Sequence, residues 1–143
     1  MDLTATRRID HPHWLCKIIG TEKDLPLAGT RVFIVEDEAL ILDTLQDMLE
    51  GLGCQVVESA LRVDEALSKL VGLDFDVAVL DVNVAGTRID PVADLLADRG
   101  MPFLFASGYG RGSLPAAHRE RVLLTKPYRT VDLRAALDSV LPQ

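Results

Sequence analysis

The sequence has few of the residues that would set it apart from ordinary globular proteins. It contains two cysteines, Cys16 and Cys54, so no disulfide framework can be argued. No apolar run approaches the roughly 20 residues that span a bilayer, and the N-terminus lacks the basic-then-apolar pattern of a signal peptide. Basic residues (15) are fewer than acidic ones (22), and the net charge of -7 would repel nucleic acid. We therefore expect a protein that binds neither nucleic acid nor membrane, with the cytoplasm as its default location.

The chain of 143 residues has the length of one domain of ordinary size. Its content of 48% hydrophobic and 26% charged residues is typical of a protein that buries its own core. Residues 1–28 differ from the rest because they show no sustained period, and Trp14, Ile18 and Ile19 are their strong apolar anchors. We therefore expect an N-terminal extension over 1–28, partly disordered or loosely docked, and one domain over 29–143.

Short apolar runs alternate with stripes of helical spacing from residue 31 to the C-terminus. The apolar runs predict strands at 32–35, 55–58, 77–80, 102–106 and 122–124. The helical stripes lie within 41–52, 63–71, 92–96 and 133–141, and glycines at 53, 72 and 100 follow three of them. Residues 110–120 hold little apolar material, so a fourth helix there should be short, irregular or mobile. The alternation predicts an α/β fold with a parallel sheet covered on both faces.

Polar residues suited to chemistry follow four of the predicted strands. They are Glu36 and Asp37 after the first strand, Asp81 and Asn83 after the third, Ser107 after the fourth and Lys126 after the fifth. Ligands of open α/β sheets bind at the carboxyl ends of the strands. We therefore expect these side chains to share one edge of the sheet.

Several carboxylates at one edge repel each other unless a cation lies between them. Magnesium, which prefers carboxylate, water and phosphate oxygens, is the natural cation for Glu36, Asp37 and Asp81. Lys126 adds a positive charge suited to a phosphate oxygen, and Ser107 adds a hydroxyl donor. Together these residues describe a site for phosphoryl transfer to an aspartate.

The segments 35–38 and 80–83, together with Ser107 and Lys126–Pro127, resemble the receiver domain of two-component response regulators. Each motif alone is common in turns and at helix ends, but the whole set in this order is specific. The resemblance covers about residues 30–141. It implies a flavodoxin-like (βα)5 doubly wound parallel sheet with the strand order 2-1-3-4-5, and a Lys126–Pro127 bond that is typically cis.

The resemblance also implies a role for each acid. Asp81 matches the aspartate that accepts a phosphoryl group from a sensor histidine kinase. Asp37 matches the residue that binds Mg²⁺ directly, and Glu36 matches the neighbouring acid that acts through water. Asn83 matches the position whose backbone carbonyl completes the metal shell. Such receivers promote their own phosphorylation and dephosphorylation, which gives them a slight catalytic character beside their role as a switch.

Two further matches and two departures concern the last strands. Ser107 matches the hydroxyl that turns toward the phosphoryl group, and Lys126 matches the lysine that bonds one of its oxygens. Leu123 stands where the family often has a Tyr or Phe that swings inward on activation. Residues 103–110 are similar to the Phe-Ala-Thr-Gly-Tyr motif of a stand-alone receiver subfamily, with Ser107 in place of Thr. We therefore expect signalling to rearrange or order two neighbouring segments, the loop that carries Tyr109 and the irregular fourth helix.

These features predict a single-domain response regulator that is phosphorylated on Asp81 and then changes its affinity for a partner protein or relays the phosphate. We expect no output domain, since 17 residues follow Lys126. The subfamily resemblance suggests a kinase of the HWE or a related class. A receiver-like scaffold that works without phosphorylation is the alternative, which Leu123 leaves open. A phosphatase of the haloacid dehalogenase kind is disfavoured because Asn83 stands where it would need a second Asp.

Overall fold

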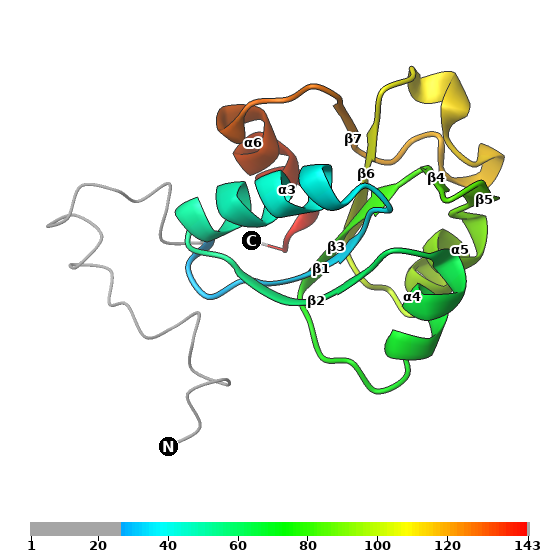
Figure 1. Cartoon of the computed structure of the whole chain (residues 1–143), viewed down its shortest axis with the longest axis horizontal. Coiled ribbons are helices and arrows are strands. Elements are labelled where there is room, and N and C mark those ends of the chain that lie inside the picture. Colours follow the sequence, from blue (N-terminus) through cyan, green and yellow to red (C-terminus); the bar gives the residue numbers. More distant parts are fainter. Residues whose placement is uncertain (1–26, 143) are drawn as a thin grey trace, which may run out of the picture.

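The computed structural model describes residues 27–142, in which helices cover both faces of a parallel sheet (Figure 1). The sheet is formed by β1 (Arg31–Val35), β2 (Gln55–Ala60), β3 (Val77–Asp81), β6 (Phe103–Ser107) and β7 (Leu123–Thr125). Its neighbouring strands are all parallel, in the order β2-β1-β3-β6-β7. The predicted flavodoxin-like order 2-1-3-4-5 is therefore confirmed.

The apolar run of β1 supplies both faces of the sheet. Val32 and Ile34 belong to one buried cluster, whereas Phe33 and Val35 belong to the other, and all four are 0% exposed. Alternate side chains point to opposite faces of a strand, so a strand covered on both sides reads as a continuous apolar run.

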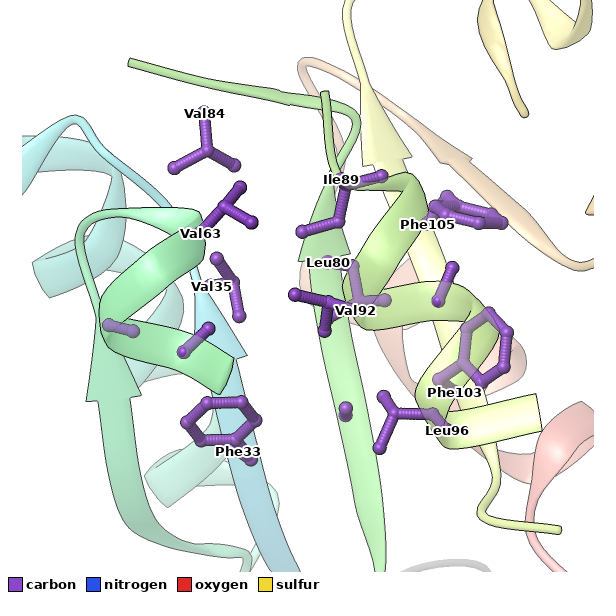
Figure 2. Packing of buried hydrophobic residues seen from close by; sticks show 14 of the residues in the cluster. Phe33, Val35, Val63, Leu80, Val84, Ile89, Val92, Leu96, Phe103 and Phe105 are labelled. Carbon is purple, nitrogen blue, oxygen red and sulfur yellow. The ribbon is translucent and has the colours of Figure 1, made fainter. Parts of the chain in front are cut away.

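Two pairs of helices cover the two faces of the sheet. The helices are α3 (Ala39–Gly51), α4 (Val63–Lys69), α5 (Asp90–Asp98) and α6 (Thr130–Val140). Figure 1 shows α3 and α6 on one face and α4 and α5 on the other. On the α4–α5 side, Val63, Val92 and Leu96 pack with Phe33 and Phe103 of the sheet (Figure 2).

The turn after α3 shows why glycine follows the helix. Gly53 has a φ of 92°, a left-handed conformation that glycine adopts without the penalty of a side chain. A Cβ atom at this position would also lie 3.3 Å from the Cα atom of Ala28. The end of α3 thus depends on a residue that the sequence analysis identified.

The region between β6 and β7 is irregular, as predicted. Two short 3-10 turns, η2 (Arg111–Ser113) and η3 (Ala116–His118), occupy the place of a fourth helix. Leu114 and His118 fix this region because both are buried, and His118 Nε2 lies 2.7 Å from Asp94 Oδ1 on α5. Its position is therefore set by a few side chains rather than by a helical ladder.

A small hairpin between β3 and α5 was not predicted. Its strands are β4 (Asn83–Val84) and β5 (Thr87–Arg88), which pair antiparallel around a two-residue turn. Ala85 and Gly86 in the turn have φ values of 51° and 81°. Two consecutive left-handed residues are typical of a tight hairpin whose twist matches its strands.

The expected N-terminal extension falls almost wholly outside the described residues, as do Trp14 and Cys16. Leu27, near its end, is 1% exposed and packs in the cluster between the sheet and α3 and α6. Within residues 27–142, no helix has the length and apolar character needed to cross a membrane.

Candidate functional site

The predicted site residues meet at the carboxyl edge of the sheet. Glu36 and Asp37 follow β1, Asp81 ends β3, Ser107 ends β6, and Lys126 follows β7. The register pairs Val35 with Leu80, Asp81 with Ala106, and Ser107 with Thr125. Parallel pairing in this register brings the strand ends to one edge, as expected from the sequence.

Three acids form a cluster at this edge. One carboxylate oxygen from each of Glu36, Asp37 and Asp81 lies within 4.8 Å of the others. Glu36 is 3% exposed, whereas Asp37 and Asp81 are partly exposed. The sequence prediction that these three acids come together is therefore correct.

Lys126 lies between two of these acids. Its Nζ atom is 2.9 Å from Glu36 Oε1 and 3.5 Å from Asp81 Oδ2. The other Glu36 oxygen accepts a hydrogen bond of 3.1 Å from the backbone N–H of Glu38. Both oxygens of the buried Glu36 thus have a donor, which is what a buried charge requires.

Asp81 is less well compensated than Glu36. Its pKa is raised to about 6, first by burial and then by the negative charge of Glu36, whose effect is larger than the lowering by the ammonium of Lys126. Burial also acts to lower the pKa of Lys126, but its bond to Glu36 and the charge of Asp81 leave that pKa above its ordinary value. Lys126 therefore stays charged at neutral pH.

The hydroxyl of Ser107 is engaged within its own loop. Ser107 Oγ accepts a 3.0 Å hydrogen bond from the backbone N–H of Tyr109 and lies 3.4 Å from Ser113 Oγ. Ser107 is buried, whereas the side chain of Tyr109 is 77% exposed. The structure thus places Ser107 at the predicted edge, with its hydroxyl bonded to the loop.

Four other features complete the surroundings of the acids. The backbone N–H of Ala85 donates a 2.9 Å hydrogen bond to Asp37 Oδ2, a contact that sequence reasoning missed. Asn83 is exposed at the start of β4, two residues after Asp81. Leu123 lines, with Tyr128 and other residues, a hollow of about 420 Å³ beside β7 and α6. The Lys126–Pro127 peptide bond is cis, as expected.

Comparisons with known proteins identify the family. The REC domain of the PhyR response regulator from Erythrobacter litoralis is 26% identical, with a TM-score of 0.69, over 80% of this chain and 91% of that one. SdrG from Sphingomonas melonis Fr1 is 38% identical, with a TM-score of 0.71, over 78% of this chain and 96% of that one. The chain belongs to the receiver domains of response regulators.

This receiver domain also has relatives among longer regulators. It is 31% identical over 121 residues to the phyllosphere-induced regulator PhyR of Methylorubrum extorquens, a match that includes 79% of the chain and 44% of PhyR. The chain spans about half the length of the curated relatives it matches. No protein-family model matches the sequence. The BeF3-activated conformation of SdrG is 39% identical, with a TM-score of 0.69, over 80% of the receiver chain and 98% of SdrG.

We expect the change Asp81→Asn to stabilise the metal-free receiver at neutral pH. The folded protein holds the Asp81 proton more tightly than the unfolded chain, since the pKa rises from 3.8 to about 6. The contribution of protonated Asp81 to the free energy of unfolding is therefore fully present below pH 3.8, and it is lost as the pH rises through about 6. At neutral pH the gain should be about 1–3 kcal/mol, given roughly 1.4 kcal/mol per pKa unit.

Urea unfolding in EDTA at several pH values measures this effect. The gain should shrink as the pH falls from about 6 toward 3.8, where Asp81 is already protonated in the folded wild type. Asp47→Asn, on the exposed side of α3, is the control and should change stability by less than about 0.5 kcal/mol. A gain in the free energy of unfolding that does not depend on pH would contradict the raised pKa of Asp81.

We expect Lys126→Met to destabilise the metal-free protein. The change leaves the buried carboxylate of Glu36 without its ammonium partner, and breaking such a pair costs about 3–5 kcal/mol. Lys69→Met is the matched control, because Lys69 pairs with Glu58 and Glu65 at partly exposed positions and should cost less than about 1 kcal/mol. The free energy of unfolding of both variants is measured in urea. Equal losses would contradict the larger contribution expected of the buried Lys126–Glu36 pair.

Proposed function

We propose that this receiver domain accepts a phosphoryl group on Asp81 from a sensor histidine kinase. The observation that carries the proposal is the position of Asp81 at a strand end, among Glu36, Asp37 and the ammonium of Lys126. An aspartate nucleophile needs this combination of a cation site and a positive group for the phosphoryl oxygens. The BeF3-activated conformation of SdrG, a similar chain, gives further support.

The transfer step makes one bond and breaks another. A carboxylate oxygen of Asp81 attacks the phosphorus of a phosphohistidine, a P–O bond forms, and the P–N bond breaks. The electron pair leaves with the imidazole, which takes up a proton. Lys126 Nζ, 3.5 Å from Asp81 Oδ2, is placed to bond a phosphoryl oxygen and to balance its charge. Asp81 must be ionised to attack, and a dication bound beside it would favour the ionised form of this carboxylate.

The donor atoms of the acid cluster fit Mg²⁺. Three carboxylate oxygens within 4.8 Å are hard ligands at a spacing suited to one small dication. In this proposal Asp37 and Asp81 bind the ion directly, Glu36 acts through water, and Asn83 contributes its backbone carbonyl. When bound, Mg²⁺ would neutralise the charge that the acids share with the phosphoryl oxygens.

The consequence of phosphorylation is proposed to be a change in the loop after β6. For Ser107 to bond a phosphoryl oxygen, its hydroxyl must turn away from the N–H of Tyr109 and from Ser113. The exposed Tyr109 then changes position with this loop. Affinity for a partner protein changes as a result, or the phosphate is relayed to a second protein. The subfamily resemblance favours a kinase of the HWE or a related class.

Incubation with Mg²⁺ and acetyl phosphate tests the chemistry. Intact-mass spectrometry should show a gain of one phosphoryl group in the wild type and none in Asp81→Asn. Asp47→Asn should behave as the wild type does, because its carboxylate lies on the exposed side of α3. A wild type that never gains the group, with acetyl phosphate or with phosphorylated histidine kinases, would support the alternative of a binding scaffold, which Leu123 leaves open.

Hydrogen exchange tests the proposed switch. Beryllofluoride with Mg²⁺ should change the exchange rates of amides 108–118, and the amide of Tyr109 should exchange faster as it loses Ser107 Oγ as its acceptor. Asp81→Asn under the same conditions should show no change. Identical exchange over 108–118 in the two states of the wild type would contradict the switch, even where phosphorylation itself is observed.

A further inference from the structure

The β4–β5 hairpin joins the acid cluster to the loop after β6. Val84 is 0% exposed and lies near Val63 in the buried cluster (Figure 2), whereas the turn residues Ala85 and Gly86 are exposed. The body of the hairpin is therefore anchored in the core. Its turn projects from that anchor to the carboxyl edge of the sheet.

The turn of the hairpin orients Asp37. The backbone N–H of Ala85 donates to Asp37 Oδ2 at 2.9 Å, and Ala85 itself has a left-handed φ of 51° within the turn. A carboxylate has about four lone-pair sites, so one hydrogen bond leaves Asp37 able to bind a cation. Hydrogen bonds to a metal ligand from groups that do not themselves bind the metal fix the orientation of that ligand.

The last residue of the hairpin contacts the irregular region. Arg88 Nη2 donates to the carbonyl of Ser113 at 3.2 Å, and Arg88 Nε bonds Asp90 Oδ1 at 3.0 Å. The hydroxyl of Ser113 donates to the carbonyl of Gly110 at 2.7 Å and lies 3.4 Å from Ser107 Oγ. Arg88 thus holds the turn η2 that packs against Ser107.

We infer that the hairpin is a positioning element that holds Asp37 for the cation and, through Arg88, couples that position to the order of the Ser107 loop. Ala85 acts through its backbone N–H, and Arg88 acts through Ser113. The inference rests on the proposed function, because it takes Asp37 as a ligand of Mg²⁺. It adds a physical connection between the metal site and the loop that does not pass through Asp81.

The first test weakens the turn without touching a ligand. Gly86→Val forces a β-branched residue into a φ of 81°, although an added Cβ meets no atom within 4 Å. Gly72→Val is the matched control, since Gly72 has a φ of 78° and equally open space but follows α4, away from the acids. MgCl2 titration of the full chain, followed by NMR, should show about tenfold weaker binding in Gly86→Val, as for the loss of an outer-shell contact. Gly72→Val should bind as the wild type does.

The second test addresses Arg88 in metal-free protein. Arg88→Ala should speed the exchange of amides 110–114 about threefold to tenfold, the effect of losing one ordinary hydrogen bond at an exposed position. Arg62→Ala is the control, because Arg62 pairs with Asp64 two residues later, as Arg88 pairs with Asp90. The exchange of these amides should not change in that variant.

The outcomes separate the inference from the proposed function. If the wild type binds no Mg²⁺, the inference and the proposed function both fail. If the wild type binds Mg²⁺ but Gly86→Val and Gly72→Val bind it equally, the positioning of Asp37 by the hairpin is wrong and the receiver function stands. If Arg88→Ala leaves the exchange of amides 110–114 unchanged, the coupling is overturned whatever the magnesium affinity.

Discussion

The ion pair between Lys126 and Glu36 is the interaction on which the carboxyl edge of the sheet depends. Three carboxylates within 4.8 Å repel one another, and Glu36 tolerates burial because Lys126 and the N–H of Glu38 donate to its two oxygens. Asp81 lies farther from the same ammonium, at 3.5 Å, and its pKa rises to about 6. The proposed acceptor is therefore an acid whose charge is less well compensated than that of Glu36. The same excess of negative charge that costs stability in the metal-free protein favours a cation at this edge of the sheet.

This pair joins residues that are 90 positions apart in the chain, and the core packing determines where they meet. Val35, Leu80 and Leu124, which precede the site residues on three strands, are all buried. Alternate side chains of each strand pack against opposite helical layers, so the last polar residue of each strand has little freedom to move along the sheet. The geometry of the site thus follows from the apolar runs that first identified the strands.

The sequence predicted the elements that depend on periodicity and missed those that depend on local backbone geometry. Strands that are covered on both faces appear in the sequence as continuous apolar runs, and these runs predicted the strands. The order of the strands in the sheet was predicted from the family resemblance. The hairpin was missed because its turn is Ala85–Gly86 rather than the Asn-Gly or Asp-Gly that signals a tight turn. Ser107 was placed correctly at the edge, but its bond with the N–H of Tyr109 depends on loop geometry that no periodicity reveals.

The irregular region after β6 is held in part by side chains that bond backbone carbonyls. The guanidinium of Arg111 donates to the carbonyls of Arg119 and Arg121 at 2.8 and 2.7 Å, and the hydroxyl of Ser113 bonds the carbonyl of Gly110. A regular helix distributes its stability over a ladder of equivalent bonds, so losing one bond changes little. Here the turns have few backbone hydrogen bonds, so the loss of one side-chain contact should loosen the region more than it would a regular helix. The proposed switch therefore acts through this region rather than through β7, where Leu123 stands in place of an aromatic ring.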